Sequence, residues 1–502
     1  MSPETRDAAS ARLRALGYET KFDRSMSVWQ NFALGFTYLS PVCGVYAMFA
    51  FGLSNGGPPM VWSYVIAGVG QMLVALIFGE IVAEFPITGG LYPWARRLAG
   101  MRWAWMTGWI YGWALFTTIA AVAVGGGPFL AVLLGLHPTP ARTAILALGL
   151  ILVSTAINLA GTKLLARVAL VGFVCEILGA IVVGVHIVLF HRHHALAVIM
   201  DRLGAGGTGA YLPAFLTATL VGAYSCYGFE ACGDVAEETT DPSRTIPKAM
   251  RMTIYVGGGA SLFIAVALLL GVADISAVIA GRDPDPIITV LKSAFGSMGA
   301  SFVVVVVMVS FVSNVLSIQA AVSRLIYAYA RDEMIGGSRA LRRLSPRTRV
   351  PSAALIVAGV VPGAIVCLGY FTENALATIV SFCTAGIYIA FQMVVAAALY
   401  SRLRGWTPRG EFTLGRLGFA TNVAALVYGV STIVNILWPR GVQWVSRYSI
   451  LMTVGAFVGS GALYMMIGKP YDRGRAPAGD AWATSVPSPS ALAGSASLSP
   501  ER

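Results

Sequence analysis

The stretch AYSCYGFEACGDVAEETTDPSRTIPKAM, residues 223–250, begins inside a long apolar run and ends in a basic segment that contains two prolines. Between these parts the chain places Gly228, Glu230 and Asp234. The apolar run is typical of a helix in lipid, where a carboxylate or a break in the helix is costly unless protein surrounds it. The stretch therefore indicates a membrane helix that is interrupted for a purpose.

The composition of the whole chain indicates a protein that crosses a membrane many times. Of its 502 residues, 57% are hydrophobic and only 12% are charged, which argues against a large soluble helical protein. Runs of about 20 mostly apolar residues are long enough to cross the ~30 Å hydrocarbon core of a bilayer. We expect an all-α membrane protein with twelve transmembrane helices, at residues 29–53, 58–84, 103–134, 141–160, 166–190, 211–234, 251–273, 298–322, 352–370, 374–400, 417–438 and 448–467.

The distribution of positive charge predicts the orientation of these spans. With the N-terminus in the cytoplasm, 28 of the 35 lysines and arginines fall in cytoplasmic segments and seven in external ones, as the positive-inside rule requires. The same excess accounts for the net charge of +12, so nucleic acid is not expected as a partner. The first 25 residues hold no apolar signal-peptide region, so the first span is expected to direct its own insertion. Both ends should lie inside, with the lipid bilayer around the spans.

The sequence carries none of the short motifs of soluble enzymes. It has no P-loop, no dinucleotide-binding glycine pattern, no HExxH and no CxxC. An ATP-driven pump is therefore not indicated, and no cofactor or bound metal is expected. The six cysteines lie within or at the edges of apolar spans, which favours packing residues over disulfides. A metal site, a pH sensor and a solvated loop are the interpretations of the histidines after the fifth span, His186, His191, His193 and His194.

Two spans carry helix-breaking residues near the middle of the membrane. The first, NFALGFTYLSPVCGVYAMFAFGL at residues 31–53, has Ser40, Pro41 and Gly44 near its centre, and proline removes a backbone donor and clashes with the preceding turn. The sixth has Gly228. Two interrupted helices are what an inverted-repeat transporter uses at its binding site; two packing kinks are the alternative.

A series of tryptophans starts at the cytoplasmic end of the third span. Trp103 and Trp105 fit a belt at the membrane interface. Trp109 and Trp113 lie deeper and four residues apart, on one helical face. They either line a cavity or pack against other helices.

Four motifs, in the right order along the chain, resemble the amino acid–polyamine–organocation superfamily of permeases. EFPITGGLYPWA at 84–95 resembles its acid-x-Pro-x-x-Gly-Gly-x-Tyr loop, and residues 227–250 resemble its sixth span with the Glu-Glu…Pro…Pro segment that follows. SRLIYAYARDEMI at 323–335 is similar to its Ser-Arg-x-x-Tyr-Ala-x-Ala-Arg-Asp signature. GEFTLGRLGFATNVAALVYGV at 410–430 looks like the branch that transports amino acids, γ-aminobutyrate and choline. The resemblance covers about residues 28–468.

This resemblance implies ten core helices in two inverted repeats of five, with two peripheral helices added. The first and sixth spans would be unwound around a substrate in the middle of the membrane. The chain would then comprise a cytoplasmic N-terminal tail, the transport core, the peripheral helices with their preceding loop, and an Ala/Ser/Pro-rich cytoplasmic tail expected to be disordered, at residues 1–28, 29–400, 401–468 and 469–502.

The resemblance places a substrate between the two breaks. Amides freed in span 1 would face a substrate carboxylate, and carbonyls freed in span 6 would meet an ammonium group. The candidate substrate-binding residues are Ser40, Pro41, Val42, Cys43, Gly44, Tyr224, Ser225, Tyr227 and Gly228, together with Trp113 of the third span. Many relatives carry Gly-Ser/Thr-Gly where this chain has residues 41–44, so an amino acid and an amine such as choline or ethanolamine both stay open as the substrate.

Glu176 lies near the middle of the fifth span, where a charge costs about 2.5–3.5 kcal/mol on insertion scales. Residues 161–167 are similar to the Gly-x-Lys-x-x-Ala-Arg run of cationic amino acid permeases, which commonly carry a lysine at the offset of Glu176. The resemblance places this position near Ser313 and Asn314 of span 8, where sodium-coupled relatives hold their ion. Glu176 is a candidate to take up a proton or to help bind sodium. A protonated, purely structural glutamate is the alternative.

Glu230 stands at the expected start of the inner half of span 6, where superfamily members often keep an acid. A carboxylate on the first turn of a helix faces the positive end of the helix dipole, so a capping role is one interpretation. The other is that Glu230 responds to substrate and proton, and links the break to a cytoplasmic gate near Glu237, Glu238 and Arg244.

Together these features predict a secondary active transporter of the inner membrane. It would import an amino acid or a related amine by alternating access, driven by a proton gradient in preference to sodium. An exchanger, a channel and a sensor that binds without transporting are the alternatives. A membrane-embedded enzyme would need a nucleophile–base pair or a metal set, and none can be assembled from the spans.

Overall fold

The computed structural model describes residues 3–19, 21–370, 375–440, 444–474 and 481. Within these ranges the secondary structure is helical, and the β-type pairing is limited to one isolated bridge between Met26 and Thr239. The prediction of an all-α membrane protein is confirmed.

Eleven segments of the described chain are helical, long enough and apolar enough to cross a membrane. They consist of α2 with α3 (Val28–Leu39, Pro41–Gly56), η1 with α4 (Pro58–Val61, Trp62–Glu84), α6 (Met101–Leu133), α7 (Pro140–Leu159), α8 (Thr162–Phe190), α11 with η4 and α12 (Pro242–Met252, Thr253–Gly258, Gly259–Gly271), α14 (Pro286–Arg331), α16 (Ser352–Gly369), α17 (Ala375–Leu403), η5 with α18 (Gly415–Leu417, Gly418–Leu437) and α19 (Trp444–Gly468). Short helices lie before, between and after these segments: α1 (Pro3–Ala15), α5 (Leu91–Ala99), η2 (Leu196–Met200), η3 (Ala236–Glu238), α13 (Ile275–Ile279), α15 (Ser338–Leu341) and α20 (Pro470–Arg473).

The sixth predicted span is the one that falls outside this set, because it is not a continuous helix. It consists of α9 (Tyr211–Ser225), a non-helical stretch, and the single turn α10 (Ala231–Asp234). The predicted limits of span 8, 298–322, were too narrow, since helical structure continues to Arg331. Hydropathy detects only the lipid-compatible part of a helix, and the last turns of α14 carry Arg324, which is fully buried by protein, and Arg331, whose side chain is 13% exposed.

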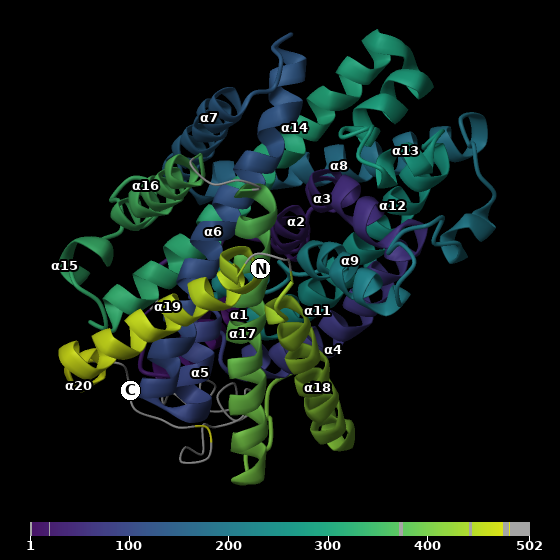
Figure 1. Ribbon diagram of the computed structural model, residues 1–502. Coiled ribbons are helices and arrows are strands. Elements are labelled where there is room, and N and C mark those ends of the chain that lie inside the picture. The colour runs from purple at the N-terminus through teal and green to yellow at the C-terminus, as the bar shows by residue number, and fades with distance from the viewer. Residues whose placement is uncertain (1–2, 20, 371–374, 441–443, 475–480, 482–502) are drawn as a thin grey trace, which may run out of the picture.

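The interrupted first span lies at the centre of the bundle, and the last two helices lie outside it (Figure 1). In the most apolar window of α2–α3, 94% of the residues are buried by protein, against 22% for α18 and 6% for α19. Helix α8 shows how the sequence determines which face of a helix is buried. It exposes Val171, Leu178 and Val182 on one face and buries Gly172 and Glu176 on the other.

The N-terminal segment, expected to be a cytoplasmic tail, packs against the end of the bundle where α4 and α14 finish. Arg97 donates to the carbonyl of Leu16, and Tyr18 donates to Asp332 at 3.3 Å. Met26 forms the bridge with Thr239. At the other terminus, α20 belongs to the segment predicted to be disordered, and most of residues 469–502 lie outside the described ranges.

Candidate functional site

Both predicted helix breaks are present. Ser40 adopts left-handed backbone geometry, with φ 46° and ψ 88°, between the end of α2 and the start of α3. Pro41 has no N–H to continue the first helix, and the Ser40 hydroxyl accepts from the amide of Cys43 to start the second. In the sixth span, α9 ends at Ser225, and Gly228 has φ 113° before α10 begins.

The two breaks contact each other backbone to backbone through glycine. A Cβ on Gly228 would lie 2.6 Å from the backbone nitrogen of Leu39, and one on Gly44 would lie 2.7 Å from the Ser225 hydroxyl oxygen. These separations are below van der Waals contact. The first and sixth spans can therefore meet at this depth only because neither glycine has a side chain.

A small cavity lies beside these contacts. Its walls come from α2, α3, α6, α9, the span 6 break and α14, through Tyr38, Leu39, Gly44, Thr118, Val122, Tyr224, Tyr227 and Asn314. The free volume is about 10 Å³, room for about one water molecule. The tyrosine rings surround it edge to face, with Tyr227 6.1 Å from Tyr38 and 5.9 Å from Tyr224 between ring centroids.

The substrate residues proposed from sequence fall into three groups. Gly44, Tyr224 and Tyr227 line the cavity. A second group builds the breaks without reaching the space: Ser40, Pro41, Val42, Cys43, Ser225 and Gly228. The expected cradle of free amides is wrong for two positions. The amide of Cys43 donates to the Ser40 hydroxyl, and that of Gly44 donates to the Ser40 carbonyl at 3.0 Å.

Trp113, the third case, points away from the cavity. Its ring packs 4.8 Å from that of Phe457 on α19 and against Phe116. Since 3.6 residues make a turn, Thr118 and Val122 lie on a different face of α6 and supply the cavity wall. Sequence reasoning missed both, and also Tyr38. The signal for Tyr38 was its place two residues before the Ser40–Pro41 break.

Glu176 is fully buried beside the first break. One carboxylate oxygen accepts a 2.9 Å hydrogen bond from the Ser40 hydroxyl, and the other has no hydrogen-bond partner. One turn earlier on α8, Gly172 packs against Ser313. A Cβ on Gly172 would lie 2.3 Å from the Ser313 hydroxyl oxygen. The Asn314 amide donates to the carbonyl of Tyr38 at 3.0 Å. The carboxylate therefore lies where α8 meets the break and α14, without a cation paired to it among the described residues.

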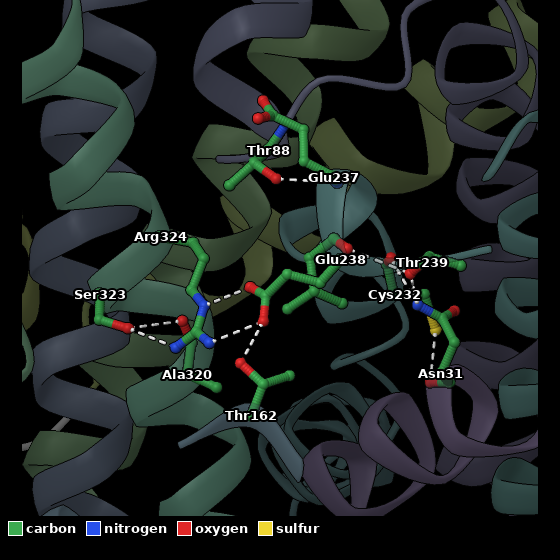
Figure 2. Close-up of polar contacts among 11 residues, drawn as sticks. Asn31, Thr88, Thr162, Cys232, Glu237, Glu238, Thr239, Ala320, Ser323 and Arg324 are labelled. Carbon is green, nitrogen blue, oxygen red and sulfur yellow. Dashed lines mark hydrogen bonds and ion pairs between the residues drawn. The ribbon is translucent and has the colours of Figure 1, made fainter. Parts of the chain in front are cut away.

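After α10, two ion pairs join the span 6 region to α14, one of them fully buried and the other partly buried. Arg324 donates to both oxygens of Glu238 at 2.8 and 3.1 Å, and Thr162 of α8 donates to the same carboxylate at 2.6 Å (Figure 2). Arg331 forms a 2.8 Å pair with Glu237. We call Glu237, Glu238, Arg324 and Arg331 the gate cluster.

Two further contacts tie the gate cluster to the rest of the bundle. Thr88, from the loop before α5, exchanges two hydrogen bonds with Glu237, through its amide at 3.2 Å and its hydroxyl at 3.0 Å. Arg244, expected beside these acids, is not part of the cluster. It lies on the exposed side of α11 and pairs with Glu411 at 3.2 Å. Arg324 and Arg331 take its place.

Glu230 accepts a 2.9 Å hydrogen bond from the amide of Gly228. Its side chain makes no capping bond to α10, so the capping interpretation does not describe this geometry. The carboxylate instead forms a hydrogen bond with the non-helical backbone of the break, at Gly228. Its second oxygen is buried without a hydrogen-bond partner.

The opposite end of the bundle holds a wider cavity of about 410 Å³, lined by residues that include Tyr46, Phe129, Asp285 and Lys292. The rings of Tyr46 and Phe129, 5.9 Å apart, lie between α3 and α6. Tyr46, Ala47 and Ala50 of α3 contribute to this lining. The acids of the gate cluster lie elsewhere in the chain, directly after α10.

Two of the four histidines noted after the fifth span form hydrogen bonds with backbone carbonyls. His186 and His194 bond to the carbonyls of Ala294 and Val272. No group of three or more metal-ligating side chains in the described ranges could hold an ion. The six cysteines are free thiols.

Comparisons with known proteins agree with this arrangement. A family model described as amino acid permease matches residues 26–459. Amino-acid permease BAT1 of Arabidopsis thaliana is 27% identical over 476 residues, which cover 86% of this chain and 89% of the relative. The choline transporter of Saccharomyces cerevisiae is 23% identical over 440 residues, covering 84% and 77%. Since the family model spans the interrupted helices, the cavity and the gate cluster, the chain belongs to the amino acid permease family, whose members are transporters and not enzymes.

Proposed function

We propose that this protein is a secondary active transporter that imports an amino acid or a related amine across the inner membrane, coupled to protons. The observation that carries the proposal is the pair of broken helices that meet around a small cavity, next to buried carboxyls that are not paired with a cation. Broken helices offer backbone groups to a polar solute at mid-membrane. A carboxyl in this setting can carry one proton per transport cycle.

Alternating access requires that the site be closed on one side of the membrane while it is open on the other. On the predicted orientation, the gate cluster closes the cytoplasmic side through its ion pairs. The cavity of about 410 Å³ would lead in from outside, and its lining includes the neighbouring rings of Tyr46 and Phe129. Import would proceed by loading from this cavity, closure over the substrate, and separation of the gate cluster.

A second substrate class, an amine without a carboxylate, is favoured by the lining. Two amides expected to bind a carboxylate are occupied by Ser40. Three tyrosines surround the cavity, and their ring faces attract a cation such as a quaternary ammonium. A thermal-shift screen of the purified protein against amino acids and amines distinguishes the classes, because a ligand that binds the folded state raises its melting temperature.

Flux must then be separated from binding. The ligand from the screen, radiolabelled, should enter liposomes that contain the protein, saturate with concentration, and exchange against unlabelled ligand inside. A sensor would bind the same ligand without flux, and a channel would show no counterflow.

We predict that Glu176→Gln loses accumulation driven by a pH gradient but keeps substrate binding. Glutamine can still accept from Ser40 but cannot release a proton, so the fold is retained and the coupling is lost. Accumulation should fall about tenfold, within the usual range of coupling between sites. The measurement is uptake with and without an imposed gradient. A variant that concentrates substrate like the wild type would make Glu176 structural.

The proposed topology predicts opposite labelling of two engineered cysteines. Arg343→Cys should react with an impermeant thiol reagent from the cytoplasm only, and Arg282→Cys from outside only. Both belong in a background with Cys367→Ser, because Cys367 is an exposed native thiol. Labelling of both from outside would overturn the twelve-span arrangement.

A further inference from the structure

Two acids lie one turn apart in the chain between Tyr227, which lines the cavity, and Glu237 of the gate cluster. The amide of Asp234 bonds to the carbonyl of Glu230 at 3.2 Å, which makes the residues neighbours at helical i, i+4 spacing. Both side chains are completely buried.

Neither carboxyl has a counter-ion in contact. Asp234 accepts from the Tyr111 hydroxyl at 2.9 Å and Glu230 from the amide of Gly228 at 2.9 Å. Each acid keeps one buried oxygen without a hydrogen-bond partner. The field of Arg324 reaches Asp234, but its guanidinium is bound to Glu238 and Ser323.

A second observation marks the same place. Tyr38 lines the cavity, its hydroxyl is buried without a hydrogen-bond partner, and it lies close enough to Glu230 for their charges to interact. The groups that face the two acids are therefore Tyr38 of α2, Tyr111 of α6, Arg324 of α14 and, on their own turn, Cys232.

The backbone around Asp234 is shaped to this carboxyl. A Cβ on Gly90 would lie 2.3 Å from its unpartnered oxygen, and the amide of Gly89 donates to its carbonyl at 3.1 Å. The Gly89-Gly90 loop thus closes over the acid and keeps it from water. Two ionised carboxylates in such a space would repel each other without compensation, whereas a shared proton removes one charge.

We propose that Glu230 and Asp234 form one proton-binding centre between the cavity and the gate cluster, in which both acids serve the coupling proton. The inference rests on the proposed function and adds a second proton-binding site to the one proposed at Glu176. When the gate cluster separates, the carboxyl O–H gives its proton to cytoplasmic water. The negative charge left behind can then pair with Arg324, released from Glu238.

The first test titrates the proton without any substrate. Infrared difference spectra between low and high pH should show a protonated-carboxyl C=O band in the wild-type protein in liposomes. Glu230→Gln and Asp234→Asn should each remove or shift the same band, because the proton belongs to the pair. Glu411→Gln, which removes a carboxyl paired with Arg244 on the exposed side of α11, is the matched control and should leave that band in place. A band that disappears in Glu230→Gln but is unchanged in Asp234→Asn would overturn the paired centre.

The second test uses the ligand found in the thermal-shift screen. Each single variant should lower the accumulation driven by a pH gradient about tenfold, and the double variant should be no worse, since residues that act as a unit are not additive. Counterflow, which needs no net proton movement, should continue. Tyr111→Phe removes the hydrogen bond to Asp234 and tests a structural role; a loss of gradient-driven uptake equal to that of Asp234→Asn would contradict proton binding at Asp234. If the wild type shows no flux, the proposed function fails, and the infrared titration still decides the proton site.

Discussion

Gly228→Ala is expected to abolish transport and to lower the melting temperature. Its φ of 113° is costly for any residue with a Cβ, by about 1–3 kcal/mol. The added carbon would also lie 2.6 Å from the backbone of Leu39, and forcing extra atoms into a packed site costs about 1–3 kcal/mol more. Because backbone at the other break cannot rotate away, the two breaks must separate. Uptake in liposomes and thermal unfolding in detergent measure the effect.

Gly258→Ala provides the matched control for this prediction. Gly258 has helical geometry, with φ −62°, and a Cβ there would meet no atom within 4 Å. Alanine is also the better helix former. This variant should therefore keep wild-type uptake and stability. If Gly228→Ala transports as well as Gly258→Ala, the contact between the breaks is not required for function.

Arg324→Gln should destabilise the protein and open the gate cluster. The side chains of Arg324 and Glu238 are 0% and 1% exposed, and removing one partner of a buried ion pair typically costs about 3–5 kcal/mol. Glu238 would be left buried with the Thr162 hydroxyl as its remaining side-chain partner among those described. Thermal unfolding measures the stability. Alkylation of Cys232, buried beside the cluster (Figure 2), should become faster because opening admits the reagent.

Two further variants decide whether the pair itself is responsible. Arg342→Gln removes a guanidinium that pairs with Glu333 at 2.8 Å but is 42% exposed, and such surface pairs contribute little. It should leave stability and Cys232 reactivity unchanged. The double variant Arg324→Gln with Glu238→Gln should be more stable than Arg324→Gln alone, since no charge remains unpaired. A double variant with additive losses would argue against a direct pair.

The sequence alone was sufficient to locate eleven of the predicted spans and the positions of both breaks. Apolar length and the Ser40-Pro41 pair act locally, through the thickness of the bilayer and the missing proline N–H. Their consequences need no knowledge of neighbouring helices. The same holds for Gly228, where a residue without a Cβ permits the non-helical backbone that the structure shows.

Which side chains meet was decided only by the tertiary structure. Trp113 and Thr118 lie on one helix, yet the first packs on α19 and the second lines the cavity. Arg324 replaced Arg244 as a partner of the gate acids because α14, distant in sequence, passes beside α10. The carboxyl of Asp234 likewise meets a tyrosine of α6 and a glycine before α5, both distant in sequence. Local chemistry fixes where a helix breaks, but partners of a buried charge depend on the rotation and register of helices far apart in the chain.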